Sequence, residues 1–391
     1  MNKNSSPRNV VSIENLKNET PVCLGKISDI NGDVPVLNQK KLKKLCSDIY
    51  KDIVGKNGFI NSYFSQRNFR YHKMLNSTVD MDGNAKMWEM AAKSNASSDL
   101  IPFTPIIAVS GGYDSGLVAR LTIDAYKNRS TKEKTDQDLI TIINFNSKYY
   151  SQDDTKRGKA YSKYLFDHYS KSVPIRLLDL KYPVSDIEKV MNQIIGKHKL
   201  FYGEIQNLPM GLTNTLITLP SEDTGLLVSV DTTNLTEFLL DEVTNGSSGG
   251  TNLAVLSGLP KTLVIAMCDI LGIGSRLNSE NSTTWESKVA SYLDGAKLKD
   301  TKRTFHAIDT ILYLAINEGK TINEIITATN YGSEFVKNVF ARTVNHSKRF
   351  HGSGQYFRGD FSPLDPKKEI FFRDYFSGGY TKRFLDLFGT K

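Results

Sequence analysis

Cysteine is scarce in this 391-residue chain, and long apolar runs are missing. The three cysteines, Cys23, Cys46 and Cys268, lie far apart and form no CxxC pair, which argues against a disulfide scaffold and against a thiolate zinc site. The six histidines are dispersed without an HxxxH or HxxEH pair, so a histidine-based zinc site is not expected either. No apolar run approaches the ~20 residues of a membrane helix, and residues 1–7 lack the apolar segment of a signal peptide. We therefore expect a cytoplasmic protein.

An excess of one charge sign is present but modest. Fifty Lys and Arg residues face 42 Asp and Glu residues, which gives a formal net charge of +8. The basic residues are scattered rather than gathered in one tract, a pattern typical of a mildly basic surface or of a protein that handles nucleotides. Nucleic acid is therefore not expected as a partner.

Strands alternate with helices from residue 105 onward. Short apolar runs predict four buried strands, at residues 105–109, 139–145, 175–180 and 226–230. Helical stretches at 116–125 and 149–169 separate the first three of these strands. Alternation of this kind predicts an α/β fold, a doubly wound parallel sheet whose ligand site lies off the carboxyl ends of the strands.

The two ends of the chain have a different character. Apolar residues at helical spacing (Leu42, Leu45, Ile49 and Ile53) predict one amphipathic helix within residues 37–64. Similar spacing predicts C-terminal helices, at residues 305–318, 322–329 and 331–349. We expect residues 1–100 to be a partly helical N-terminal extension, residues 101–300 to be the main domain, and residues 301–391 to pack helices and an aromatic tail on that domain.

The strongest motif is Ser110-Gly-Gly-Tyr-Asp-Ser115, between the first predicted strand and its helix. Two glycines let the backbone approach a ligand closely, and the helix that follows adds its positive N-terminal end. This loop can cradle a pyrophosphate. A carboxylate at Asp114 would then need a cation between itself and the phosphates, and magnesium is usually held by one or two carboxylates plus phosphate oxygens. The motif lacks the Lys-Ser/Thr ending of a Walker loop and the spacing of GxGxxG.

This loop resembles the SGGxDS signature of the N-type ATP pyrophosphatases, which cleave ATP between the α- and β-phosphates. Three later segments, 230–238, 245–253 and 257–261, resemble the order of motifs in NAD synthetases, and segments 307–319, 321–326 and 345–349 resemble their C-terminal helices. The resemblance implies a Rossmann-like fold of the adenine nucleotide alpha hydrolase type, with extra N-terminal helices and a helical C-terminal cap. It also implies ATP and Mg²⁺ as cofactors and a homodimer as the assembly.

The resemblance assigns roles to individual residues of this chain. Asp114 and Lys261 would be catalytic, with Lys261 neutralising charge on the α-phosphate, and Asp114 and Glu237 would hold the metal. The ATP contacts would come from Ser110, Gly111, Gly112, Tyr113, Asp114, Ser115, Thr232 and Lys261. Substrate contacts would come from Asn207, Asn234, Ser248, Asn252, Lys348 and Arg349.

The implied reaction adenylates the nicotinate carboxylate of deamido-NAD and amidates it with ammonia, giving NAD, AMP and pyrophosphate. Residues 1–100 are too few for the nitrilase-type domain of glutamine-dependent NAD synthetases, so the nitrogen would come from free ammonia or from a separate glutaminase.

Three departures from the NAD synthetase pattern leave alternatives open. Ser248 and Asn252 replace acidic residues, residues 207–214 contain no arginine, and residues 272–279 replace an acidic loop. The acceptor half has therefore diverged while the ATP half is intact. The alternatives are another N-type ATP pyrophosphatase amidoligase or tRNA-modifying enzyme, and a catalytically weak homologue that binds nucleotide.

Overall fold

The computed structural model describes residues 39–65, 102–146, 152–181, 227–240, 253–277, 301–316, 318–337 and 339–340. Its centre is a sheet of five parallel strands in the order β3-β2-β1-β4-β5. The strands are β1 (Pro105–Ala108), β2 (Ile140–Asn146), β3 (Ile175–Lys181), β4 (Val228–Asp231) and β5 (Leu253–Ala254). The four strands predicted from sequence are confirmed, and the short β5 is an addition to them.

The strand order reverses beside β1. The chain steps from β1 to β2 and then to β3 in one direction, whereas β4 pairs with the other edge of β1. Successive residues of these strands are apolar on both faces: Ile107 and Ile142 lie in the main core, and Ile106 and Ile143 lie in a second cluster. Parallel sheets need this double apolar character because both faces are covered. The point between β1 and β4 is a topological switch point, where α/β proteins bind their ligands.

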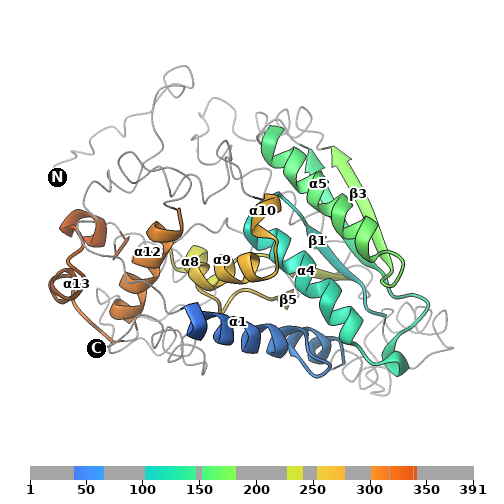
Figure 1. Ribbon diagram of the computed structural model, residues 1–391, viewed down its shortest axis with the longest axis horizontal. Coiled ribbons are helices and arrows are strands. Elements are labelled where there is room, and N and C mark those ends of the chain that lie inside the picture. Colours follow the sequence, from blue (N-terminus) through green and yellow to red (C-terminus); the bar gives the residue numbers. More distant parts are fainter. Residues whose placement is uncertain are drawn as a thin grey trace, which may run out of the picture.

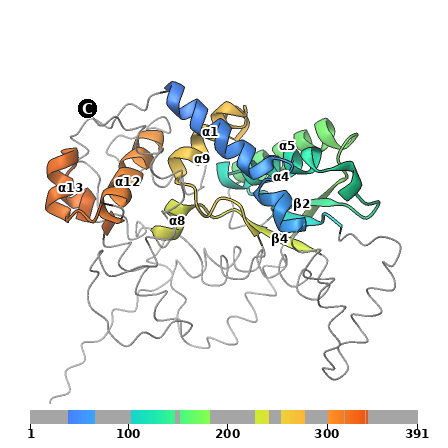
Figure 2. The same ribbon diagram turned by 90° about the horizontal axis from the view of Figure 1, so that it is seen from below.

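Two helices connect the first three strands. Helix α4 (Tyr113–Asn128) follows β1, and α5 (Gln152–Tyr169) follows β2, with the short helix η2 (Thr131–Glu133) after α4. Figure 2 shows α4 and α5 on one side of the sheet, next to the N-terminal helix α1 (Gln39–Val54). Both α4 and α5 begin at the carboxyl ends of their strands, so their positive N-terminal ends lie at the same edge of the sheet.

Helix α1 (Gln39–Val54) buries an apolar stripe in the same core as the sheet. It packs on α4 and on α9 (Lys261–Ile270), and the Tyr50 hydroxyl donates to Asp124 of α4 at 2.8 Å. Sequence spacing predicts one helix within residues 37–64, whereas the structure has two helical segments there: α1 ends at Val54, and a second segment covers residues 59–65. The turn between them is closed by the Asn61 amide, which donates to Gly55 O and to Ala125 O, both at 2.9 Å.

All but one of the remaining described helices lie on the β4–β5 side of the sheet (Figure 1); the exception, α10 (Gly274–Leu277), packs against α5, α9 and α4. The others are α8 (Leu235–Leu239), α9 (Lys261–Ile270), α12 (Thr301–Ile316) and α13 (Ile322–Thr329). Helix α13 begins with a capping box between Thr321 and Glu324 and ends at Asn330, whose φ of 55° is left-handed. The helices predicted at residues 305–318 and 322–329 are confirmed. Of the predicted helix at 331–349, residues 333–337 and 339–340 are helical, and residues 341–349 lie outside the described residues.

No described helix is long and apolar enough to cross a membrane. Cys46 and Cys268 are free and buried, and burial raises the pKa of the Cys46 thiol to about 12. Cys23, the first 38 residues and the aromatic tail after residue 340 lie outside the described residues.

Candidate active site

The glycine-rich loop is folded tightly at the carboxyl end of β1. Gly111 has a φ of 97°, which an L side chain rarely adopts. A Cβ atom on Gly111 would lie 2.5 Å from the Asp154 carbonyl oxygen in the first turn of α5. The hydroxyl groups of Ser110 and Ser115 lie 3.1 Å apart, and Ser115 Oγ also accepts from Ser110 N at 3.1 Å. These hydrogen bonds and the close approach to α5 fix the loop against its neighbouring elements.

Gly158 is a part of this arrangement that sequence reasoning missed. A Cβ atom on Gly158 would lie 3.0 Å from Val109 O and 3.1 Å from Gly111 N. The loop backbone and the α5 backbone thus touch directly, and glycine at both positions permits the contact. A glycine in the middle of a polar helix was the available signal, because glycine weakens a helix interior unless packing needs it.

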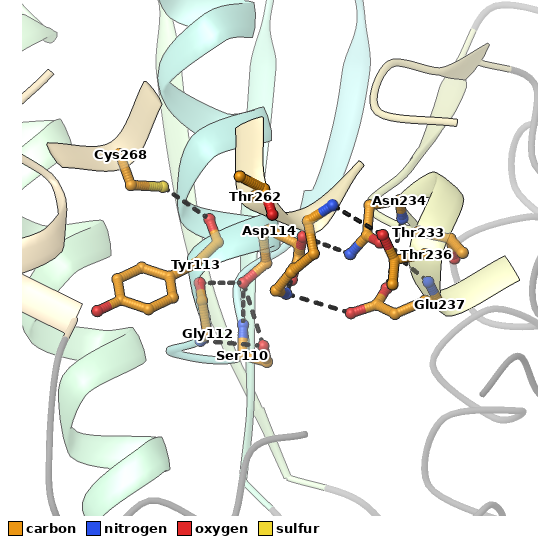
Figure 3. Close-up of polar contacts among 12 residues, drawn as sticks. Ser110, Gly112, Tyr113, Asp114, Thr233, Asn234, Thr236, Glu237, Thr262 and Cys268 are labelled. Atoms are coloured by element: carbon orange, nitrogen blue, oxygen red, sulfur yellow. Dashed lines mark hydrogen bonds and ion pairs between the residues drawn. The ribbon is translucent and has the colours of Figure 1, made fainter. Parts of the chain in front are cut away.

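Asp114 lies in the first turn of α4, where it is nearly buried and both carboxylate oxygens are engaged. The Asn234 amide nitrogen donates to Asp114 Oδ1 at 2.9 Å, and the Lys261 ammonium pairs with Asp114 Oδ2. The same ammonium lies 3.3 Å from Glu237 Oε1. Figure 3 shows the side chains of Asp114, Asn234 and Glu237 pointing toward one another, with the Tyr113 ring pointing away. One cation therefore lies between two carboxylates at the switch point.

The turn after β4 delivers Asn234 and Glu237 to this cluster. Asp231 at the strand end accepts from the Thr233 backbone N–H at 2.9 Å and from its hydroxyl at 2.8 Å. Asn234 then caps α8, accepting from Glu237 N at 3.0 Å, while Glu237 Oε2 accepts from Asn234 N at 3.3 Å. This reciprocal capping box fixes both side chains. Asn234 is fully buried and is hydrogen-bonded to both carboxylate residues of the cluster, Asp114 and Glu237.

Lys261 is the first residue of α9 and is fully buried. Its backbone N–H donates to the Thr236 hydroxyl at 2.8 Å. That hydroxyl in turn donates to Asp309 Oδ1 of α12 at 2.5 Å, and Asp309 Oδ2 accepts from Thr262 N at 2.9 Å. Burial raises the pKa of the Asp309 carboxyl to about 6, against the opposing effect of these hydrogen bonds.

The donor set around Lys261 suits a magnesium ion as well as an ammonium. Two carboxylates already converge on one positive charge, and hard oxygen ligands of this kind, completed by phosphate oxygens and water, are those that Mg²⁺ prefers. Within the described ranges, no group of three or more His, Cys, Asp or Glu side chains gathers as metal ligands. Asp114 and Glu237 therefore fit a site that a nucleotide would complete.

Some of the site residues predicted from the sequence lie together in the structure. The structure brings Ser110–Ser115, Asn234, Glu237 and Lys261 together, and Thr232 lies half-buried directly after β4. The predicted substrate residues Asn207, Ser248, Asn252, Lys348 and Arg349 lie outside the described residues. Asp309 and Thr236 were missed. The sequence evidence that could have found this pair was a single acidic residue in the apolar pattern of α12, between Ile308 and Ile311.

A parallel sheet with a glycine-rich loop and a buried acid–lysine–acid cluster at its switch point defines an α/β protein built to bind a ligand at that edge. The chain belongs to the NAD synthase family, whose model matches residues 102–350.

Several solved structures are similar at low sequence identity. The NMN synthetase of Francisella tularensis is 14% identical over 75% of this chain and 99% of its own, with a TM-score of 0.43. The NH3-dependent NAD synthetase of Campylobacter jejuni is 14% identical over 82% of this chain and 98% of its own, with a TM-score of 0.45. The glutamine-dependent NAD(+) synthetase of Cytophaga hutchinsonii is 13% identical over 82% of this chain and 56% of its own, with a TM-score of 0.47. No curated protein matches the chain.

Proposed function

We propose that this protein is an ATP-dependent ligase that converts deamido-NAD, ATP and ammonia into NAD, AMP and pyrophosphate. The observation that carries the proposal is the Lys261 ammonium, fully buried between Asp114 and Glu237 beside the Ser110–Ser115 loop. Membership of the NAD synthase family supports the choice of reaction. Burying a lysine with two carboxylates costs desolvation free energy, unless the charges compensate one another or bind a ligand.

Each part of the site has a task in this reaction. The loop, with its two serine hydroxyls and the N-terminal end of α4, holds the β- and γ-phosphates. A nicotinate carboxylate oxygen attacks the α-phosphorus, the bond from that phosphorus to the bridging oxygen breaks, and pyrophosphate leaves. Lys261 stabilises the negative charge that grows on the α-phosphate. Ammonia then attacks the acyl carbon and loses a proton, and AMP leaves with the bonding electron pair.

Asp114 and Glu237 would hold magnesium in this proposal, and the metal would supply charge neutralisation at the phosphate oxygens. Asn234 keeps Asp114 in the orientation that faces Glu237, through the 2.9 Å hydrogen bond described above. The ammonia is free or is delivered by a separate glutaminase, and the enzyme acts as a homodimer in the cytoplasm.

The test is a product balance. The protein is incubated with ATP, magnesium, ammonium and deamido-NAD, and AMP, pyrophosphate and NAD are followed together. Equal amounts of all three are expected. The matched control is Asp167→Ala, which removes an exposed carboxylate paired with Lys163 on α5 and leaves turnover unchanged. Release of ADP and inorganic phosphate would contradict the chemistry, and AMP without NAD would contradict the acceptor.

A further inference from the structure

Helix α9 begins without a cap of its own. Its N-cap residue is Pro260, which makes no side-chain cap hydrogen bond. The first N–H groups of a helix have no partner inside that helix and need one from elsewhere. Here two other helices supply the partners: Thr236 of α8 accepts from Lys261 N at 2.8 Å, and Asp309 of α12 accepts from Thr262 N at 2.9 Å.

Asp309 joins these two caps into one unit. Its second carboxylate oxygen accepts from the Thr236 hydroxyl at 2.5 Å, so a single buried side chain binds both α8 and α9. A negative charge at this position also lies at the positive end of α9, where it is stabilising. One helical turn before Asp309, the Phe305 ring lies 5.7 Å from Lys261 Nζ. One face of α12 thus lies near the Lys261 ammonium through Phe305 and binds the neighbouring residues Thr236 and Thr262 through Asp309.

We propose that Asp309 is a positioning residue for the ligase reaction. By capping α9 from outside, it fixes the backbone from which Lys261 reaches Asp114 and Glu237, although no atom of Asp309 touches the substrate. The inference rests on the proposed function, because it assumes that Lys261 acts at the α-phosphate. A displacement of about 1 Å in a catalytic group can lower a rate about 100-fold, so loosening this cap lowers turnover without removing a substrate contact.

The first test uses matched substitutions in the relay. Thr236→Val keeps the side-chain shape and removes the hydroxyl, whereas Thr236→Ser keeps the hydroxyl. Asp309→Ala removes both acceptor oxygens, whereas Asp309→Asn keeps one acceptor oxygen that can still accept from Thr262 N. The control is Thr310→Val, since the Thr310 hydroxyl donates only to His306 O within α12.

We expect kcat to fall about 10- to 100-fold in Thr236→Val and Asp309→Ala, with the KM for ATP within about twofold of the unaltered protein. Thr236→Ser and Asp309→Asn restore most of the rate, and Thr310→Val leaves it unchanged. A folded Thr236→Val variant with unaltered kcat overturns the inference. So does a rate loss that appears wholly as a higher KM. Because Thr236→Val is isosteric, it remains informative where Asp309→Ala does not fold.

A second measurement needs no turnover and separates this inference from the proposed function. Amide hydrogen exchange at Lys261 and Thr262 reports the two cap bonds directly. We expect exchange there to accelerate at least about tenfold in Asp309→Ala and Thr236→Val, and not in Thr310→Val. If these two variants show faster exchange but the unaltered protein forms no AMP, the proposed function is refuted and the cap is supported. Unchanged exchange in a folded Thr236→Val variant refutes the cap itself.

Discussion

Lys261→Met tests the central feature of the site, a cation between two carboxylates. The substitution keeps the length and apolar character of the stem and removes the charge. The side chains of Asp114 and Glu237 are only 12% and 16% exposed, so water replaces little of the lost interaction. Removing one partner of a buried ion pair costs roughly 3–5 kcal/mol, and we expect the free energy of unfolding to fall by about that amount.

The same variant makes a prediction about metal binding. Without the ammonium, the two carboxylates are free to share another cation. Magnesium at about ten times its dissociation constant would restore about 1.4 kcal/mol. Sodium chloride at matched ionic strength would not. The double variant Asp114→Asn/Lys261→Met leaves one uncompensated carboxylate in place of two, so it is more stable than Lys261→Met and loses most of the magnesium response.

Urea unfolding followed by circular dichroism, without nucleotide, measures these differences. The matched control is Lys320→Met, which removes a half-exposed lysine paired with Glu318 and costs no more than about 1 kcal/mol. The reasoning is refuted if Lys261→Met costs no more than Lys320→Met, or if magnesium stabilises the single and double variants equally.

Three further predictions concern the loop and its surroundings. Asp114→Ala lowers AMP and NAD formation at least about 100-fold, and unaltered turnover in that variant would contradict the metal assignment. Gly111→Ala lowers the unfolding free energy by about 1–3 kcal/mol because its φ is 97° and its Cβ meets Asp154 O. The control Gly258→Ala meets nothing within 4 Å and changes stability by less than about 0.5 kcal/mol; equal effects at the two glycines would refute the argument. Because burial raises the pKa of Asp309 from 3.8 to about 6 in the folded state, the unfolding free energy of the unaltered protein relative to Asp309→Asn is highest below pH 4 and falls by about 3 kcal/mol as pH rises through 6. A rise over that interval in urea titrations would contradict it.

The sheet was predictable because buried parallel strands are continuous apolar runs. β1, β2, β3 and β4 each contain such a run, bounded by polar or turn residues. β5 was not predictable, since two residues, Leu253–Ala254, are too short to show a pattern. The break after Val54 was hidden for a different reason. Apolar residues continue on both sides of the turn, and the Asn61 hydrogen bonds that close it are tertiary contacts.

Part of the site could be located from a short sequence motif, and the rest depends on contacts between residues that are far apart in the sequence. Ser110–Ser115 is a contiguous motif, so the loop and Asp114 could be located from sequence. Glu237 and Lys261 could be placed only through the resemblance to a family, because a lone surface-type residue carries no signal. The contacts of Asp309 with Thr236 and Thr262 join segments that no local pattern connects. Only the packing of α12 against α9 brings them together.

The packing of α1 has a consequence for the newly synthesised chain. The apolar stripe of α1 is covered by α4 and α9, and α9 begins only at Lys261. During translation from the N-terminus, α4 can cover part of that stripe once residues up to Asn128 are made, but the part that packs on α9 stays uncovered until α9 has left the ribosome. Contacts between such distant segments slow folding, and exposed apolar surface on an incomplete chain promotes aggregation. The place of α1 in the core therefore delays the burial of its apolar stripe until the second half of the chain is being made.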